Sequence, residues 1–290
     1  MTTVQNLNTQ AQPSVSGRVT PWGVLRSEWL KLASLRSTYW LAGITIAGSV
    51  TTAGMFALLF RMSLAEMTDP AGQPIDSAEM AGPGPGFVAI SVVSTALVTI
   101  AILAVLAITS EYSSGSIRTT FTSVPSRQRV LGAKTVIIVL LSGVVTLISA
   151  ALSWLVMRII YPAGFSVEGN GLLTVVGGSA LYLMAIAAFA VGVGALVRSS
   201  AAAMSIVLGL FLILEQVVLV VAMVNSTVAN IAAYLPSTAG SLITGASISG
   251  EMLRSSGAPE LTAWQGFGVL MIWVVVVYSL GALRLQKGDA

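Results

Sequence analysis

The feature that most constrains this chain is a set of six long apolar runs, which together take up about half of its 290 residues. The runs cover residues 39–60, 87–109, 135–157, 171–197, 201–224 and 261–283, and only the fifth contains a charged residue, Glu215. A helix rises about 1.5 Å per residue, so about 20 apolar residues cross the hydrocarbon core of a bilayer. The sequence therefore predicts an all-α polytopic membrane protein with six transmembrane helices.

The basic residues predict how these helices are oriented. Eleven of the fourteen Lys and Arg residues lie before the first run, between the second and third, between the fourth and fifth, or after the last. The other three connections contain only Arg61, Arg158 and Arg254. Basic residues accumulate on the cytoplasmic side of a membrane, so both termini are predicted to be cytoplasmic. The expected location is the inner membrane of a bacterium.

Two segments precede the first run. Residues 1–20 are rich in Gln, Asn, Thr and Ser, which predicts a disordered tail. Thr20-Pro21 is typical of a helix start, and an apolar series follows it at helical spacing with cations largely on the other faces. This pattern predicts an interfacial helix over residues 21–37 that contacts membrane lipid, although an inward extension of the first span is the alternative. The series consists of Trp22, Leu25, Trp29 and Leu32.

The remaining boundaries and connections follow from the same runs. Residues 38–284 form the predicted membrane domain, and residues 285–290 form a cytoplasmic tail. The connection over residues 225–260 contains an apolar stretch too short to cross a bilayer, so we expect short helices at the external surface or a segment that dips partway into the membrane. In the fourth run, Ala188 with Gly192 and Ala190 with Gly194 place small residues four apart, which favours close helix packing.

The composition argues against catalysis by this chain. It contains no Cys and no His, so it lacks the commonest general base and transition-metal ligand. A phosphate-binding loop needs the pattern G-x-x-x-x-G-K-[ST], and the nearest approach, at residues 132–135, lacks both required glycines. We therefore expect no enzyme activity, no metal and no cofactor bound by the chain itself, and no nucleic-acid partner.

Glu215 is the one acid well inside an apolar run. A charged side chain near the middle of a bilayer costs about 2.5–3.5 kcal/mol on insertion scales, so intramembrane acids tend to face protein or water. With Gln216 beside it, Glu215 is a candidate for the transport pathway or a dimer interface. The alternative is a protonated structural Glu that is satisfied by a neighbouring hydroxyl or carbonyl. The sequence favours neither.

The most informative polar segment lies between the second and third runs. It contains Glu111-Tyr112, then Gly115-Ser116-Ile117-Arg118, then residues 123–127, Ser-Val-Pro-Ser-Arg. This order resembles the corresponding loop of ABC-2-type exporter permeases. Residues 25–32, with a Glu followed by a Lys before the first span, are similar to the N-terminal entry of that family. Six spans with both termini inside also match, so the resemblance covers nearly the whole chain.

The resemblance implies a function and partners. In such permeases this loop forms a helix that docks on a separate ATP-binding subunit, and the N-terminal helix forms an interfacial elbow. The implied partners are two copies of an ABC ATP-binding subunit, which would supply ATP and Mg, and a second permease copy or homologous permease that completes the pathway as a dimer. The implied docking element runs from Ser113 to about Phe121. Its coupling residues are Glu111, Ser113, Ser114, Gly115, Arg118 and Phe121.

Other functions remain open on the residues alone. A proton-coupled secondary transporter could use Glu215, but it would need inverted repeats, and none is visible between residues 39–157 and 171–283. An intramembrane enzyme or a non-transporting membrane sensor subunit is a third class, and the missing His and the lack of clustered acids argue against the enzyme. For an exporter, an apolar pathway favours amphipathic cargo over simple ions.

Overall fold

The computed structural model describes residues 20–65, 84–113, 127–162 and 171–287, and every long element in these ranges is a helix. Six of them have a stretch long and apolar enough to cross a membrane. The predicted all-α fold with six transmembrane helices is therefore confirmed. They are α2 (Arg36–Ala65), α3 (Gly86–Ser113), α5 (Arg127–Ile160), α6 (Gly171–Val197), the composite helix α7 (Ser200–Leu208), η2 (Gly209–Leu214) and α8 (Glu215–Ala222), and α12 (Ala263–Lys287).

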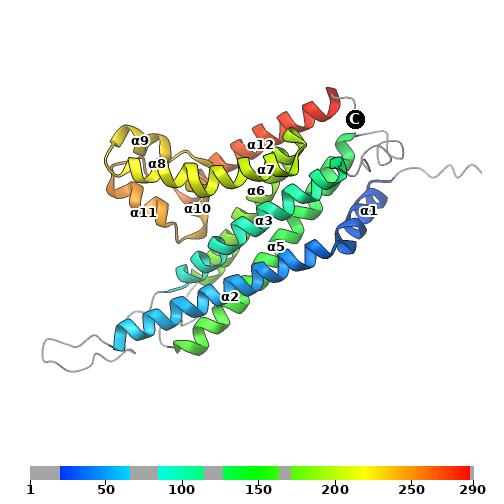
Figure 1. Cartoon of the computed structure of the whole chain (residues 1–290). Helices are drawn as coiled ribbons and strands as arrows, with labels where there is room; N and C mark the ends of the chain where they lie inside the picture. Colours follow the sequence, from blue (N-terminus) through cyan, green and yellow to red (C-terminus); the bar gives the residue numbers. More distant parts are fainter. Residues whose placement is uncertain (1–19, 66–83, 114–126, 163–170, 288–290) are drawn as a thin grey trace, which may run out of the picture.

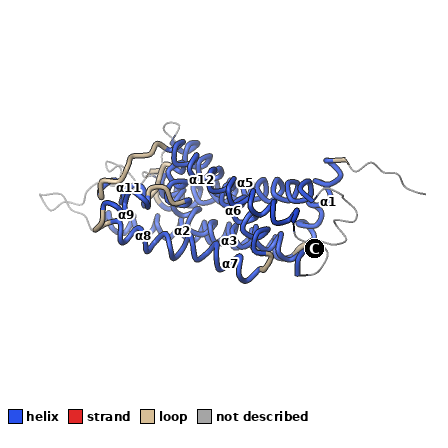
Figure 2. Tube along the Cα trace, turned by 90° about the horizontal axis from the view of Figure 1, so that it is seen from above, coloured by secondary structure: helices blue, strands red, loops and turns tan. Residues whose placement is uncertain are grey.

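The long helices run side by side in three layers (Figure 1). Helices α2 and α5 form one layer, α3 and α6 the middle layer, and α12 with the α7–α8 helix the third. The start of α1 (Pro21–Ser34) and the end of α12 lie at the same end of the molecule, here called the termini end. The opposite end, which carries the short helices α9 and α11, is called the distal end (Figures 1 and 2). The orientation of these ends in a membrane stays a prediction.

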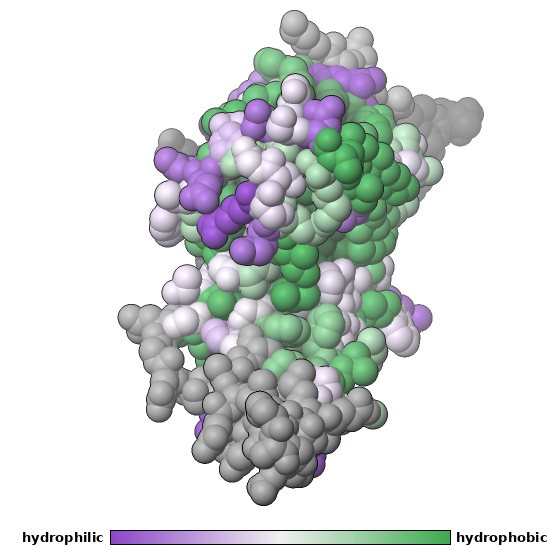
Figure 3. Space-filling view, turned by 90° about the vertical axis from the view of Figure 1, so that its left-hand side faces the viewer, coloured by the Kyte–Doolittle hydropathy of each residue, from purple (hydrophilic) through white to green (hydrophobic). Residues whose placement is uncertain are grey.

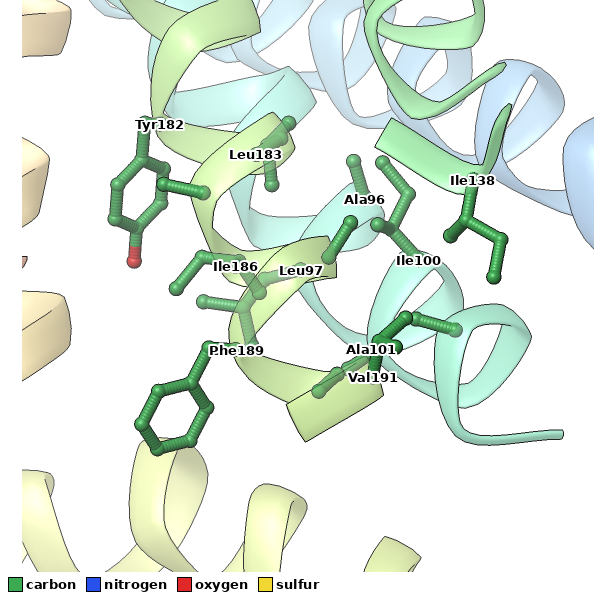
Figure 4. Packing of buried hydrophobic residues seen from close by; sticks show 14 of the residues in the cluster. Ala96, Leu97, Ile100, Ala101, Ile138, Tyr182, Leu183, Ile186, Phe189 and Val191 are labelled. Atoms are coloured by element: carbon green, nitrogen blue, oxygen red, sulfur yellow. The ribbon is translucent and has the colours of Figure 1, made fainter. Parts of the chain in front are cut away.

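Helix α6 is at the centre of the bundle. In its most apolar window 72% of the residues are buried, against 22% in each of α2, α12 and the α7–α8 helix, whose remaining apolar side chains face outward. Figure 4 shows Leu183 and Ile186 of α6 beside Leu97 of α3, and Ile138 of α5 belongs to the same buried cluster. An outward apolar surface on the peripheral helices is what contact with lipid requires.

Small residues let α6 approach its neighbours closely, as the four-residue spacing predicts. A Cβ atom on Gly192 would lie 3.0 Å from the backbone nitrogen of Tyr278 in α12. A Cβ atom on Gly281 would lie 2.7 Å from the carbonyl oxygen of Gly192. On another face, a Cβ atom on Gly194 would lie 2.5 Å from the side chain of Ile108 in α3. These glycines therefore set the distance between α6 and the helices on either side.

Helix α1 begins where the sequence predicts. The Thr20 side chain accepts a hydrogen bond from the backbone N–H of Gly23, and Pro21 is the first helical residue. Its buried face consists of Val24, Glu28 and Leu32. Of the predicted apolar series, Leu32 is buried and Leu25 is partly buried against the core, whereas Trp22 is 75% and Trp29 is 50% exposed. The two Trp rings are thus available to a lipid surface, and the interfacial position stays a prediction.

The connection before α12 folds into the short helices α9 (Ser226–Ala232), α10 (Pro236–Ser241), η3 (Leu242–Thr244) and α11 (Ile248–Ser255). Helix α10 and η3 insert between α6 and α12, since a Cβ atom on Gly178 of α6 would collide with the Ile243 carbonyl group. Tyr182, which contacts Ser237 of α10, lies eleven residues into α6, or about 16 Å along its axis. Helices α10 and η3 therefore enter the bundle, while α9 and α11 lie at the distal end. Their position relative to a membrane stays a prediction.

Candidate functional site

The predicted coupling residues lie at and beyond the end of α3. Glu111 is in the last turn of α3, and Ser113 is its final residue. Ser114, Gly115, Arg118 and Phe121 lie outside the described residues. Residues 114–126 connect the end of α3, at Ser113, to the start of α5, at Arg127. Both helices that flank this connection are described.

Four charged side chains meet where this connection is anchored, at the termini end. Lys134 of α5 lies 2.6 Å from Glu28 of α1 and 3.0 Å from Glu111 of α3. Lys31 of α1 lies 2.6 Å from the other oxygen of Glu28 and 3.2 Å from Glu111. The charges therefore alternate around a closed ring, called here the charge ring, with no net charge.

The Glu28–Lys134 pair of the charge ring is shielded from water, whereas the side chains of Glu111 and Lys31 are 13% and 40% exposed. Glu28 is 1% exposed and Lys134 is 3% exposed. Removing one partner of a buried ion pair typically costs about 3–5 kcal/mol, because the other charge is left without compensation. The ring therefore holds α1 against the ends of α3 and α5 as long as all four groups are charged.

The protonation of Lys31 favours an intact ring at neutral pH. Partial burial acts to lower the pKa of Lys31, but its hydrogen bond to Glu28 and the charge of Glu111 outweigh this, and the pKa is raised above its ordinary value of 10.5. A lysine whose pKa is raised on folding contributes stability that is complete below its ordinary pKa and lost only as the pH rises through the raised value. The contribution of Lys31 therefore does not change across the physiological range.

Sequence reasoning missed three of the four members of the charge ring as site residues, namely Glu28, Lys31 and Lys134. Glu28 and Lys31 contribute only to the resemblance of residues 25–32 to the family's N-terminal entry and to the charge asymmetry, and Lys134 only to the charge asymmetry and the incomplete phosphate-loop pattern. One signal was available, since Lys134 directly precedes an apolar run, where a charged group needs a partner. The pairing of Lys134 with Glu28 joins residues 106 positions apart, so it could not be read from spacing.

Two arginines, Arg198 and Arg284, join neighbouring helices at the termini end beside the charge ring. Arg198, with a φ of 62° in the two-residue link between α6 and α7, donates to the carbonyl oxygen of Arg284 in α12 at 2.7 Å. Arg284 donates in turn to the carbonyl oxygen of Leu196 at 2.6 Å. Cations at helix C-termini satisfy carbonyls that lack helical partners. The guanidinium of Arg198 also lies 5.5 Å from the ring centre of Tyr112 in α3. These contacts join α3, α6 and α12 beside the charge ring.

The second buried polar cluster surrounds Glu215, deep in the bundle. One carboxylate oxygen accepts a hydrogen bond from the backbone N–H of Ser237 at 3.0 Å. The other accepts from the backbone N–H of Thr238 at 3.0 Å and from its hydroxyl at 3.1 Å. Glu215 is 1% exposed, and the Ser237 hydroxyl pairs with the Tyr182 hydroxyl at 2.7 Å. The carboxylate thus caps the first turn of α10.

The helix geometry around Glu215 supports this arrangement. The preceding segment η2 is a π-helix, a rare form that often marks functional sites and changes which residues face a neighbour. Each oxygen of Glu215 accepts from a backbone N–H of α10, which is the pattern of a carboxyl group that caps a helix. Gln216 is exposed and lines an adjacent hollow. The structure therefore separates the two: Glu215 anchors α10, and Gln216 faces open space.

No group of three or more Asp, Glu, His or Cys side chains that could hold a metal ion occurs among the described residues. The two polar clusters therefore differ in character. The charge ring lies between helices that flank the α3–α5 connection, and the Glu215 cluster fixes an inserted segment near the opposite end.

Six lipid-compatible helices, a basic termini end and a segment inserted between two of the helices define a multi-pass membrane protein of the permease class. The sequence model described as "ABC-2 family transporter protein" matches residues 25–290. The chain therefore belongs to the ABC-2 transporter family, and the predicted family is confirmed. No curated protein sequence matches the chain significantly. Members of this family are membrane subunits that work with an ATP-binding partner.

Proposed function

We propose that this chain is the membrane subunit of an ATP-driven exporter in a bacterial inner membrane, with both termini in the cytoplasm. It forms the transport pathway as a dimer with a second copy or a homologous permease. Two copies of a separate ABC subunit bind ATP and Mg and dock at the termini end, through the α3–α5 connection.

The charge ring is the observation that carries the coupling role. It joins α1 to the last turn of α3 and the second turn of α5 through the contacts of Lys134 with Glu28 and Glu111. A docking element can move transmembrane helices only if its anchors are firmly joined to them. The ring provides this junction, because breaking a buried ion pair is strongly unfavourable.

A proton-coupled transporter is less well supported. Such a mechanism needs an acid that exchanges protons with water, and Glu215 is 1% exposed with both oxygens engaged by donors from α10. The same contacts give Glu215 a role in holding the inserted segment, which is independent of proton exchange.

Affinity purification tests the proposal. The tagged chain should co-purify with an ABC-type ATP-binding protein from native membranes, and Phe121→Asp should abolish this while leaving membrane insertion intact. Gln286→Asp is the matched control, because Gln286 is exposed at the same end but lies outside the α3–α5 connection. Retention of the ATP-binding protein by Phe121→Asp would refute docking at this connection.

A further inference from the structure

A hollow of about 330 Å³ opens between α3, the η2–α8 part of the fifth span, and the α10–α11 segment. Its apolar walls include Val93 and Leu97 from α3 and Phe211 and Leu219 from the fifth span. This volume is at the lower end of the range for small-molecule sites, about 300–1,000 Å³. Figure 3 views the molecule from the distal end and shows hydrophilic patches directly beside strongly hydrophobic surface.

The polar groups of the hollow are neutral. Hydroxyl and amide side chains from α3, α6, α8, α10, η3 and α11 line it, and none of its described lining residues is charged. A charged ligand group would lose its hydration here without finding an opposite charge, which is strongly unfavourable. The nearby Glu215 does not provide that charge, because its oxygens are directed at α10. The hollow therefore selects against ions of either sign.

The hydroxyls of Ser94, Thr244 and Ser241 keep capacity mainly for accepting, while the Gln216 amide offers both N–H donors and an acceptor. The Ser94 hydroxyl donates to the carbonyl oxygen of Ser91 at 3.1 Å, the Thr244 hydroxyl to that of Ser241 at 2.7 Å, and the Ser241 hydroxyl to that of Thr238 at 3.0 Å. A hydroxyl has one proton to donate and two lone pairs. With these protons used on the backbone, the hydroxyl oxygens can still accept, so a ligand with its own O–H or N–H groups finds more partners here than one without them.

The walls of the hollow are held in place. Ser237 is fixed through its backbone by Glu215 and through its hydroxyl by Tyr182. Ser241 and Ser247 pair at 2.7 Å and join α10 to the start of α11. A site whose polar groups are positioned in advance loses less entropy on binding.

We propose that this hollow binds an uncharged amphipathic molecule whose polar part carries hydroxyl or amide N–H donors, and that such a molecule is a substrate of the permease. The role in transport rests on the proposed function. Binding itself does not, because it requires only this chain.

Photo-labelling of the purified chain in lipid nanodiscs tests the proposal. Four probes share one diazirine-bearing alkyl chain and end in a primary alcohol, a methyl ether, a carboxylate or a quaternary ammonium group. Mass spectrometry locates and counts the adducts. The alcohol should label α3 and the α10–α11 segment saturably, at least fivefold more than each of the other three probes.

Two substitutions sharpen the result. Ser94→Trp should fill the hollow and abolish saturable labelling, since Ser94 is an exposed lining residue whose replacement leaves the core intact. Val144→Trp, on the outward face of α5, is the matched control and should label normally. Equal labelling by the charged or ether probes, labelling that does not saturate, or labelling unaffected by Ser94→Trp would overturn the proposal. If the tagged native chain does not co-purify with an ATP-binding protein, the proposed function is wrong, but the labelling result still shows that the hollow binds the alcohol probe.

Discussion

Replacing Glu215 with Gln and with Leu gives the sharpest prediction from the structure. Gln keeps the shape of the side chain and one carbonyl oxygen, but its NH₂ group must take the place of the other carboxylate oxygen. Both oxygens of Glu215 accept from N–H groups of α10, so this NH₂ group would face a donor in either orientation. Leu removes both acceptors while keeping a similar volume. The two changes therefore remove one or both caps of α10.

The expected losses follow from the hydrogen bonds. A buried donor left without a partner costs about 1–3 kcal/mol. Glu215→Gln leaves one backbone donor unpaired and should reduce the free energy of unfolding by about 1–2 kcal/mol. Glu215→Leu leaves two, those of Ser237 and Thr238, but it also removes a desolvated carboxylate, so we expect a loss of about 2–3 kcal/mol. At about 2 °C per kcal/mol for a chain of this size, the apparent Tm should fall by about 2–4 °C and 4–6 °C, respectively.

Thermal unfolding of the purified variants, followed by size-exclusion fluorescence, measures this order. Gln216→Leu is the control, because Gln216 is adjacent and exposed, and its apparent Tm should stay within about 1 °C of the native value. If Glu215→Gln is as stable as the native protein, a protonated Glu satisfied by an acceptor explains the site better, and the capping interpretation is wrong.

Three further predictions test other parts of the structure. Lys134→Met would leave Glu28 and Glu111 to share Lys31 as their only cation in the charge ring, so the apparent Tm should fall by about 6 °C or more. A smaller fall would mean that water solvates the remaining carboxylates. Gly192→Val should separate α6 from α12 and destabilise the fold by at least about 1–3 kcal/mol, whereas Gly43→Val, which meets no neighbouring atom, should be tolerated in the same unfolding assay. In this Cys-free chain, Ser255→Cys should react with an impermeant maleimide in intact cells, while Gln286→Cys should react only after permeabilisation; the reverse result would invert the topology.

Sequence was sufficient for the features that depend on local physics. The apolar length fixes the existence and number of the long helices, because lipid offers no partner for backbone polar groups. The start of α1 at Thr20-Pro21 follows from capping chemistry, and the close approach of α6 at Gly192 follows from side-chain size.

The sequence was insufficient for features that depend on contacts between residues far apart in the chain. Glu28 and Lys134 are distant in the chain, and several other charges near the apolar runs were equally plausible partners by spacing alone. The role of Glu215 was open for the same reason, since its donors come from α10, twenty-two residues later. Residues 231–236 are apolar but too short to span a bilayer, and this length alone does not show that the segment after them, α10 and η3, enters the bundle. That entry depends on the space left by Gly178 of α6 and Gly266 of α12.

The continuity of α3 relates the charge ring to the hollow. Glu111 of the ring and Ser94 of the hollow belong to this one helix and are separated by seventeen residues, or about 25 Å along its axis. Helix α3 contains no described π segment, whereas the facing fifth span contains η2 beside the hollow. A displacement applied to α3 at the termini end is therefore expected to shift the α3 wall of the hollow as a rigid body, with the strain absorbed at η2. The maleimide reactivity of Ser94→Cys should then change when Lys134→Met loosens the ring, and unchanged reactivity would mean that the two ends act independently.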